Sequence, residues 1–212
     1  MQRGIMISLE GIDGAGKTTQ RDVIEEYLQT KGIPYIVTRE PGGTPYAEKI
    51  RELLLSKHDE PVDIVTETMM FYAARKQHIE QVIEPHLVKG YVVLCDRFAD
   101  STFAYQRAKG IASHQIADIE KVSIGYFKPN WTFYFDIDID TSMLRAAARG
   151  RLDRLEEEFY ANAVATIEGY KMRIVQDPAR FLVIDGKPHP TEVAAVVRAT
   201  LDKIFSSEST DL

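Results

Sequence analysis

The sequence predicts an α/β fold in which helices cover both faces of a parallel sheet. Short apolar segments with the composition of strands alternate with segments of helical spacing along the chain, which is typical of consecutive strand–helix–strand units. The first strand leads into a glycine-rich turn, GIDGAGKTT, and then into a helix. The length of 212 residues fits one domain, so we expect a single domain over residues 1–212.

Each expected element follows from composition and spacing. Apolar, β-branched or aromatic runs predict five strands: Ile5–Glu10, Tyr35–Thr38, Tyr91–Cys95, Trp131–Ile137 and Phe181–Ile184. Apolar residues three or four positions apart predict the helices between them: Lys17–Lys31, Tyr46–Leu55, Ser113–Phe127, Ser142–Arg149, Glu156–Gln176 and Thr191–Phe205. The region Val62–Lys89 predicts a long, interrupted helix. The connections between parallel strands should be right-handed.

The overall composition argues against several classes of protein. The formal net charge of −6 is unlike the basic surplus of a general nucleic-acid binder. Cys95 is the only cysteine, so neither an intramolecular disulfide nor a cysteine metal cluster can form. No apolar run approaches the roughly 20 residues of a membrane helix, and we find no signal peptide. We therefore expect a cytoplasmic protein without nucleic-acid or membrane partners.

The glycine-rich turn is a candidate phosphate-binding loop, because residues 11–18 match G-x-x-x-x-G-K-[ST] in full. Its glycines let several backbone N–H groups point at one anion at a helix N-terminus. Lys17 would reach the β- and γ-phosphates, and Thr18 would help to hold Mg²⁺. The candidate ATP-binding residues are Gly11, Ile12, Asp13, Gly14, Ala15, Gly16, Lys17, Thr18 and Thr19. The loop alone fits a kinase or an ATPase, whereas the N/T-K-x-D motif that reads guanine in GTPases is absent.

Two charged pairs follow the second and third strands, at the sheet edge where ligands bind in parallel folds. TREPGG contributes Arg39 and Glu40, and CDRFADSTFAYQ contributes Asp96 and Arg97. Arg97 suits bidentate binding of a phosphate, and Asp96 could bind Mg²⁺ through water. The alternative is that each pair is a surface or structural ion pair.

Two expected helices offer side chains suited to a planar base. Phe71 and Arg75 of MFYAAR share one helix face, so a ring and a fork of donors lie together. The alternative is that Phe71 belongs to the core. Thr102, Tyr105 and Gln106 offer a hydroxyl, a ring and an amide on one side of another helix.

A basic segment, LRAAARGRLDR, carries four arginines close together: Arg145, Arg149, Arg151 and Arg154. One interpretation is a solvated basic helix end. The functional hypothesis is a mobile flap whose arginines close over ATP, stabilise charge on the phosphoryl group and exclude water.

Together these segments resemble the thymidylate kinases over nearly the whole chain. TREPGG and D-R-aromatic-x-x-S-x-x-A-Y-Q, in that order, are specific to this family. The resemblance implies a three-layer α/β/α P-loop NTPase fold of the nucleoside monophosphate kinase type. It would have a five-stranded parallel sheet and a short lid at about residues 145–156. The resemblance also implies ATP-dependent phosphorylation of dTMP to dTDP with Mg²⁺, in a homodimer.

For the acceptor base and sugar, the resemblance implies one role for each matching residue. Phe71 would stack on thymine and Arg75 would bond its O4. Thr102 and Gln106 would read the other edge of the base. Tyr105 would pack under the sugar.

For the phosphates, the resemblance implies that Asp13 positions the sugar and phosphate of dTMP. Arg97 and Arg51 would grip that phosphate, with Glu40 nearby. The catalytic residues implied are Asp13, Lys17, Arg97, Arg149, Arg151 and Arg154. Arg151 stands where the family often has an acidic or neutral residue, which leaves open which lid arginine reaches the transferred phosphate.

The metal site implied by the resemblance consists of Glu10 and Asp96 with Thr18. Gly14 follows Asp13 where some members carry a catalytic arginine, so the arginine-rich lid indicates the bacterial type. Phe98 departs from the tyrosine or histidine that often follows Asp-Arg, which puts a hydroxyl or imidazole role there in doubt.

Three rival functions remain open at this point. The first is a kinase for another nucleoside monophosphate, against which Phe71, Arg75 and Gln106 argue. The second is an ATPase-type module that signals by binding and would leave the lid arginines unexplained. The third is a nucleic-acid-binding ATPase, which the acidic balance disfavours.

Overall fold

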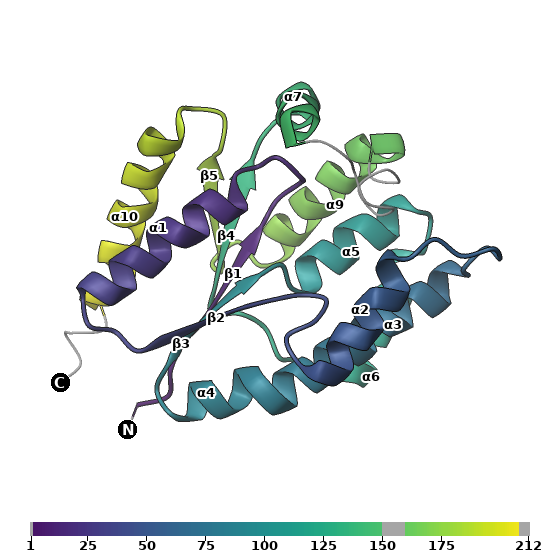
Figure 1. Cartoon of the computed structure of the whole chain (residues 1–212), viewed down its shortest axis with the longest axis horizontal. Helices are drawn as coiled ribbons and strands as arrows, with labels where there is room; N and C mark the ends of the chain where they lie inside the picture. The colour runs from purple at the N-terminus through teal and green to yellow at the C-terminus, as the bar shows by residue number, and fades with distance from the viewer. Residues whose placement is uncertain (1, 150–159, 208–212) are drawn as a thin grey trace.

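Figure 1 shows the computed structural model, in which a five-stranded sheet stands between two groups of helices. The structure describes residues 2–149 and 160–207. The strands are β1 Met6–Glu10, β2 Tyr35–Arg39, β3 Val92–Asp96, β4 Trp131–Asp136 and β5 Phe181–Asp185. Their order in the sheet is β2-β3-β1-β4-β5, and all neighbouring pairs are parallel. The expected fold class is therefore confirmed.

The helices also follow the predicted order. They are α1 Lys17–Thr30, α2 Pro45–Leu55, α3 Ile64–His78, α4 Glu84–Val88, α5 Ala99–Ala108, α6 Ser113–Ile124, α7 Ile139–Arg149, α9 Ala163–Gln176 and α10 Pro190–Ser207. The long helical region is interrupted, as predicted, by a π-helical turn, η1 Ile79–Ile83, between α3 and α4. This wide turn comes just before Pro85, which has no N–H for a regular helical hydrogen bond.

Where the predicted start is described, several helices begin one to three residues away from it, and α7 differs most. α7 begins at Ile139 instead of Ser142, because the Asp138 carboxylate accepts a hydrogen bond from the backbone N–H of Thr141 at 2.8 Å and so caps the helix earlier. The predicted start of the next helix at Glu156 lies outside the described residues, and α9 is described from Ala163.

The central strands β1, β3 and β4 are buried on both faces, which explains why they are largely apolar. All five residues of β1 are buried. Successive residues face opposite sides: Ile7 and Leu94 belong to one apolar core, whereas Met6 and Val93 belong to the other. Cys95 is buried in the second core, as predicted. Polar side chains that bind ligands therefore concentrate at the strand ends.

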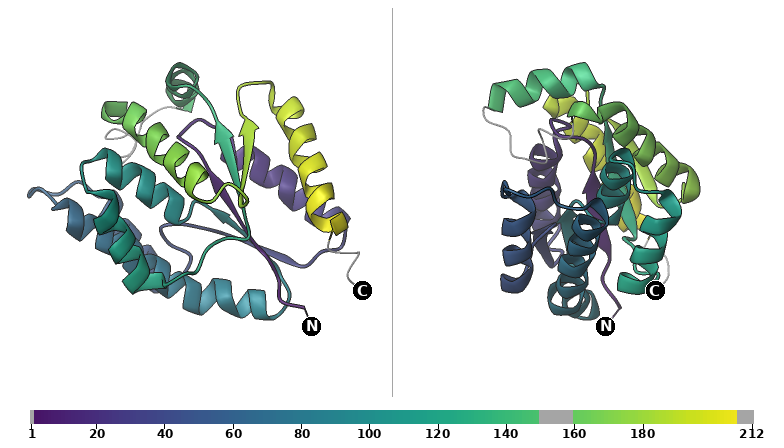
Figure 2. Two further views of the ribbon diagram at one scale, coloured as in Figure 1. Left: turned by 180° about the vertical axis from the view of Figure 1, so that it is seen from behind. Right: turned by 90° about the vertical axis from the view of Figure 1, so that its right-hand side faces the viewer.

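The views in Figures 1 and 2 place α1 and α10 side by side on one face of the sheet, while α2 to α6 lie on the other. α5 and α9 pack closely, because Gly169 of α9 leaves room for the backbone of α5. A Cβ at Gly169 would lie 2.7 Å from the Cα of Ala104. This approach brings the next residue, Tyr170, to the carboxyl ends of the central strands. In the described part of the chain, no helix combines the length and apolarity needed to cross a membrane.

Candidate active site

The candidate phosphate loop, residues 11–18, connects β1 to α1. Gly16 precedes α1 with φ 88°, a left-handed conformation that glycine adopts without strain. A Cβ there would meet nothing within 4 Å among the described residues, so conformation, not space, requires glycine. Thr18 and Thr19 lie exposed in the first turn of α1. This is the loop geometry that lets backbone N–H groups face an anion.

Lys17 is buried within this loop. Its Nζ donates hydrogen bonds to the carbonyl oxygens of Gly11 at 2.9 Å and Ile12 at 3.0 Å. Burial, followed by the charge of Arg97, lowers the pKa of Lys17 to about 8, while Asp13 acts in the opposite direction. Near neutral pH this ammonium is still mostly charged, and an anion in the loop would compensate its burial.

Arg97 connects the loop to the other half of the site. It follows β3 directly and has φ 68°, a strained conformation for a residue with a Cβ. Its Nη1 donates to the carbonyl oxygen of Gly11 at 3.1 Å, to Ser101 Oγ at 3.0 Å and to the Tyr170 hydroxyl at 3.3 Å. Its Nη2 donates to Asp13 Oδ1 at 2.5 Å. One guanidinium therefore bonds residues of the phosphate loop, of α5 and of α9.

Glu10, at the end of β1, is fully buried. Oε1 accepts from the backbone N–H of Phe98 at 2.7 Å, and Oε2 accepts from Ser101 Oγ at 2.5 Å and the Tyr170 hydroxyl at 3.0 Å. Burial raises the pKa of Glu10 to about 7; Asp100 also raises it, and the Ser101 hydrogen bond lowers it. Both oxygens accept from protein donors, so Glu10 anchors the N-terminus of α5. Its expected metal role stays a prediction.

Asp96 and Thr18 fit a magnesium site better. Asp96 ends β3, and its Oδ1 is buried without a hydrogen-bond partner in the part of the chain that the structure describes. The Asp96 charge acts on the pKa of Lys17, so this carboxylate lies near the loop. Carboxylate and hydroxyl oxygens are the hard ligands that Mg²⁺ prefers. Their metal role stays a prediction.

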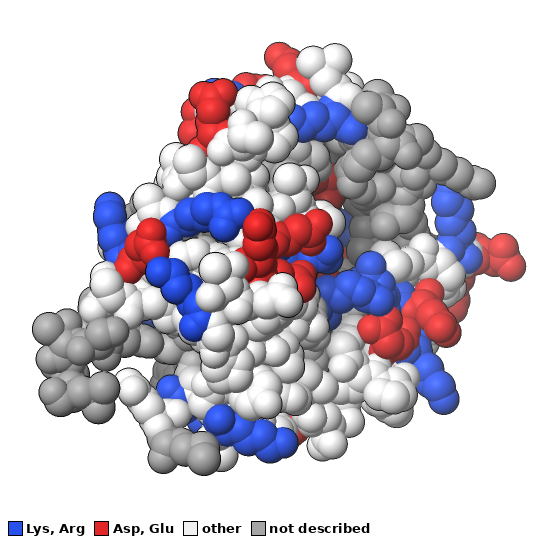
Figure 3. Space-filling model, turned by 60° about the vertical axis from the view of Figure 1, so that its left-hand side comes forward, with Lys and Arg blue, Asp and Glu red and all other residues white. Residues whose placement is uncertain are grey.

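A pocket of about 220 Å³ lies beside the loop, and Figure 3 shows acidic and basic side chains together around a hollow in one face of the molecule. The pocket brings together all nine residues expected to bind dTMP: Asp13, Glu40, Arg51, Phe71, Arg75, Arg97, Thr102, Tyr105 and Gln106. Phe71 is half-buried and belongs to neither apolar core, which disfavours the alternative of a purely structural ring. The lining also includes residues that the sequence did not single out, such as Ser101 and Lys109.

Arg75 is fixed in the pocket wall. Its Nε donates to Glu40 Oε2 at 2.6 Å and its Nη2 donates to Thr102 Oγ1 at 2.9 Å. The guanidinium lies over the rings of Tyr72 and Phe98, at 4.7 and 5.1 Å from their centroids. The Phe98 ring supports the Arg75 guanidinium through its face. This contact does not require a hydroxyl or imidazole group at position 98. Arg75 Nη1 is buried and has no partner among the described residues, so this donor is available to a ligand.

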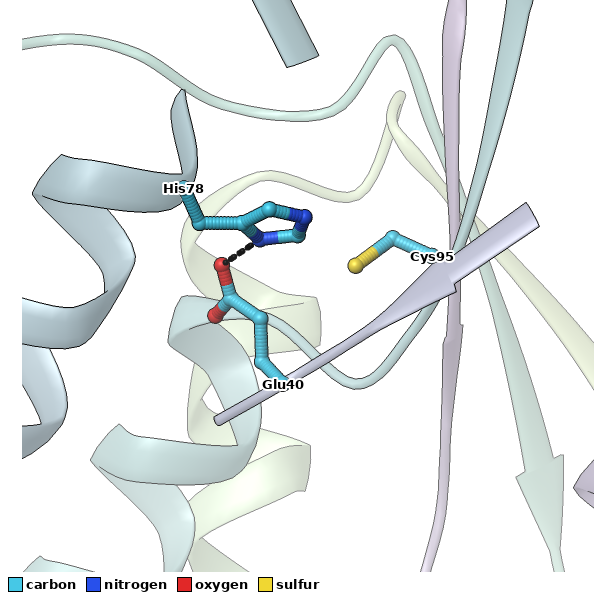
Figure 4. Close-up of side chains that lie close together, drawn as sticks. All are labelled: Glu40, His78 and Cys95. Atoms are coloured by element: carbon cyan, nitrogen blue, oxygen red, sulfur yellow. Dashed lines mark hydrogen bonds and ion pairs between the residues drawn. The ribbon is translucent and has the colours of Figure 1, made fainter. Parts of the chain in front are cut away.

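Glu40 bonds Arg75 and also lies against the His78 ring, as Figure 4 shows. Its Oε1 pairs with His78 Nδ1 at 3.0 Å, and His78 Nε2 pairs with Thr38 Oγ1 at 2.7 Å. The ligand atoms of Glu40, His78 and Cys95 lie within 4.8 Å of one another, close enough for a metal. However, the Glu40 and His78 atoms already have partners, and a cation there would meet the Arg75 guanidinium. Glu40 is thus a buried partner of Arg75 and not part of a surface ion pair.

The other end of the pocket gathers groups suited to a sugar phosphate. The Tyr105 hydroxyl donates to Asp13 Oδ2 at 3.3 Å, and the Tyr105 ring lies 5.2 Å from the Arg97 guanidinium. Arg51 Nη1 donates to the carbonyl oxygen of Pro41 at 2.8 Å. Two arginines and a carboxylate therefore line the same end of the pocket as the phosphate loop.

The expected lid begins at Arg145, but this residue is anchored. Its Nη1 donates to the carbonyl oxygens of Gly14 at 3.1 Å and Gly186 at 2.9 Å. Ser142 Oγ also donates to the carbonyl oxygen of Asp13 at 2.6 Å. The start of α7 is thus docked on the phosphate loop, and the lid role of Arg145 stays a prediction. The Arg149 side chain, Arg151 and Arg154 lie outside the described residues, and their catalytic role stays a prediction.

Sequence reasoning missed three residues that hold the site together. Tyr170 of α9 bonds Glu10 and Arg97, Ser101 of α5 bonds the same two, and Glu67 of α3 bonds Gln106. Ser101 lies inside DRFADSTFAYQ, where it could have been found. Tyr170 and Glu67 carry no local motif, so only the packing of distant helices reveals them.

Comparisons with known proteins bear on this geometry. The family model for thymidylate kinase matches residues 9–197. The chain is 45% identical over 205 residues to the thymidylate kinase of Ectopseudomonas mendocina, covering 96% of this chain and 98% of the relative. It is 45% identical to that of Hahella chejuensis, covering 93% and 95%. A crystal structure of thymidylate kinase from Ehrlichia chaffeensis matches with a TM-score of 0.73 and 32% identity, covering 94% of this chain and 99% of that one.

The buried Glu10 carboxyl should leave a signature in the pH dependence of stability. Its pKa is raised in the folded state, so between about pH 4.5 and 7 the folded protein binds more protons than the unfolded chain. This group's contribution to stability is therefore present at low pH and lost as pH rises through about 7. Glu10→Gln should remove a drop on the order of 2–3 kcal/mol between pH 5 and 7.5. Urea unfolding of both proteins at the two pH values measures it, and parallel changes would contradict the assignment.

Proposed function

This chain belongs to the thymidylate kinase family, and from that premise we propose how its residues share the reaction. The enzyme phosphorylates dTMP to dTDP with ATP as the phosphoryl donor. The observation that carries our residue assignment is the convergence of all nine expected acceptor-binding residues on one pocket beside the phosphate loop.

The thymine base binds at the Arg75 end of the pocket. Phe71 stacks on the base, and Arg75 Nη1, the donor without a partner among the described residues, bonds O4. Gln106 Oε1, likewise buried without a described partner, accepts from N3–H. Thr102 holds Arg75 in place and completes this edge of the site.

The sugar and phosphate of dTMP bind at the other end. Arg97 and Arg51 hold the acceptor phosphate, because guanidinium groups match its geometry. Asp13 positions Arg97 and the sugar, and Tyr105 packs under the sugar. Glu40 acts through Arg75. Binding dTMP requires Arg97 to exchange some of its present bonds for bonds to phosphate.

ATP binds through the backbone N–H groups of residues 11–19. Lys17 leaves the carbonyl oxygens of its own loop for the β- and γ-phosphates, which are stronger partners for a buried ammonium. Thr18 and Asp96 would hold Mg²⁺, which supplies positive charge to the phosphates when bound. We retain Glu10 as the second carboxyl group of this metal site.

The transfer itself depends on position and charge. The acceptor is already an anionic phosphate, so no strong general base is needed, and the site has to hold two phosphates in line. Lys17 and Arg97, which both bond the carbonyl oxygen of Gly11, offset the developing charge. We retain Arg149, Arg151 and Arg154 as the lid arginines that complete this charge and exclude water.

We propose that the protein is a single-domain cytoplasmic homodimer. Met69 of α3, Val122 of α6 and Tyr126 just after α6 are exposed apolar or aromatic residues, and α3 packs on α6. Together they offer an apolar face of the kind that a second copy of the chain would cover. The cytoplasm supplies ATP and Mg²⁺ for the reaction.

Acceptor specificity is the direct test of the function. ADP release with Mg²⁺-ATP should be strong with dTMP and weaker with dUMP, because one methyl group in an apolar pocket is worth about 1–3 kcal/mol. The comparison should include UMP, dCMP, AMP and GMP, which we expect to be poor acceptors. A different preferred acceptor would overturn the base-site assignment, and ADP release indifferent to every acceptor would favour an ATPase.

The charge-neutralising roles are tested by substitution. Lys17→Ala or Arg97→Ala should lower kcat by about a hundredfold or more, by analogy with the loss of one oxyanion donor. Lys31→Ala, at the far end of α1, and Arg198→Ala on α10 are matched controls and should keep wild-type rates. Near-normal turnover by folded Lys17 or Arg97 variants would refute the assignment.

The proposed dimer face is tested by a charge. Val122→Asp, at a position 89% exposed, should shift the protein from dimer to monomer in sedimentation equilibrium, because an unpaired carboxylate would be buried at the interface. Val196→Asp on the exposed face of α10 is the control and should leave the dimer intact. A wild-type monomer, or a Val122→Asp dimer as stable as the control, would contradict this face.

A further inference from the structure

Glu67 is a buried carboxylate in the first turn of α3 that faces α5. Its Oε1 accepts a hydrogen bond from Gln106 Nε2 at 2.9 Å and forms an ion pair with Lys109 Nζ at 2.6 Å. Only 3% of Glu67 is exposed. An ammonium at this distance favours the ionised carboxylate over the acid. Glu67 therefore presents acceptors alone to Gln106.

This contact decides which way the Gln106 amide points. An amide has a donating end, NH₂, and an accepting end, C=O, and it can turn over to suit its neighbours. A carboxylate has no proton to donate, so the NH₂ group must face Glu67 and Oε1 must face away from it. Oε1 is buried without a partner among the described residues, and Gln106 lines the pocket. The pocket thus receives an acceptor.

A second carboxylate fixes a donor on the same pocket in the same way. Glu40 holds Arg75 through Nε, and Thr102 holds it through Nη2, which leaves Nη1 for the pocket. Arginine stays protonated in proteins, so Nη1 can only donate. The wall therefore carries one fixed donor and one fixed acceptor.

We propose that Glu67 is a positioning residue that sets base selectivity by locking the Gln106 amide with its oxygen toward the acceptor base. This inference rests on the proposed function. A thymine or uracil ring offers O4 as an acceptor and N3–H as a donor, which complement Arg75 and Gln106. A cytosine ring offers the reverse, an N4 amino donor and an N3 acceptor. It would place donor against donor and acceptor against acceptor.

The lock matters because a buried polar group left without a partner is costly. A site built to hydrogen-bond a substrate group rejects the mismatched analogue far more strongly than an apolar pocket does. If Gln106 could turn over freely, its NH₂ would donate a hydrogen bond to the cytosine N3. The mismatch between Gln106 and the cytosine N3 would then disappear. Only the mismatch between the Arg75 donor and the N4 amino group of cytosine would remain.

The test compares kcat/KM for dTMP and dCMP in the wild type and two variants. Glu67→Gln keeps the size of the side chain, but its amide can accept or donate, so Gln106 is no longer locked. We expect the ratio of dTMP to dCMP to fall by at least about tenfold. Glu67→Asp keeps an acceptor-only carboxylate and should retain more of the ratio than Glu67→Gln. Thermal unfolding and the KM for ATP serve as controls, because general loosening would lower both kcat/KM values together.

The outcomes separate this inference from the function on which it rests. A wild type without dTMP kinase activity would overturn both. An active wild type whose ratio survives in Glu67→Gln, or falls equally in both variants, would overturn the role of Glu67 alone. A lower ratio in Glu67→Gln, with a gain in dCMP turnover relative to dTMP and partial retention in Glu67→Asp, supports it.

Discussion

The buried carboxyl group of Glu10 joins the two halves of the active site. It ends the central strand immediately before the phosphate loop, and it accepts hydrogen bonds from the start of α5 and from Tyr170 of α9. α5 carries Thr102, Tyr105 and Gln106. The acceptor side of the site is therefore held against β1, the strand that leads into the phosphate loop. The register of the sheet and this one buried group thus set the spacing between the two substrates. Phosphoryl transfer requires two phosphates in line. Burying the Glu10 carboxyl group costs free energy of folding, but it keeps the two substrate sites aligned.

A second theme is that buried or partly buried carboxylates fix the groups that we propose as ligand contacts. Asp13 holds Arg97, Glu40 holds Arg75, and Glu67 holds Gln106. In each case the partner is left with its remaining atoms turned toward the pocket or the loop. Such groups need little reorganisation when a substrate binds, which is how a rigid scaffold favours a particular charge and hydrogen-bond pattern. The overall negative charge of the chain is therefore compatible with a site that binds anions.

The sequence was sufficient to predict the five strands and the pocket residues, because these signals are local. A glycine loop between a strand and a helix, and polar residues after apolar strands, have one reasonable arrangement in a parallel sheet. What escaped prediction depends on contacts between distant segments. Tyr170 bonds Glu10, which is 160 positions away in the sequence. Arg145 bonds the carbonyl oxygen of Gly14 in the phosphate loop, and no residue near Arg145 in the sequence indicates this contact. The partners of Glu10 were hidden for the same reason: its motif predicts a place near the metal but not the hydrogen bonds to Ser101 and Tyr170.

The left-handed backbone of Arg97 has a consequence for how this position evolves. A glycine would adopt φ 68° without strain, so the backbone and the side chain place opposite demands on this residue. Replacement of Arg97 by glycine would relax the backbone, but it would remove the bonds to Asp13, Ser101 and Tyr170. A change to glycine would therefore stabilise the backbone but would cost the enzyme the side-chain bonds of Arg97. In a lineage that no longer needs the activity, we expect glycine to replace Arg97 early, because only the side-chain bonds oppose that change.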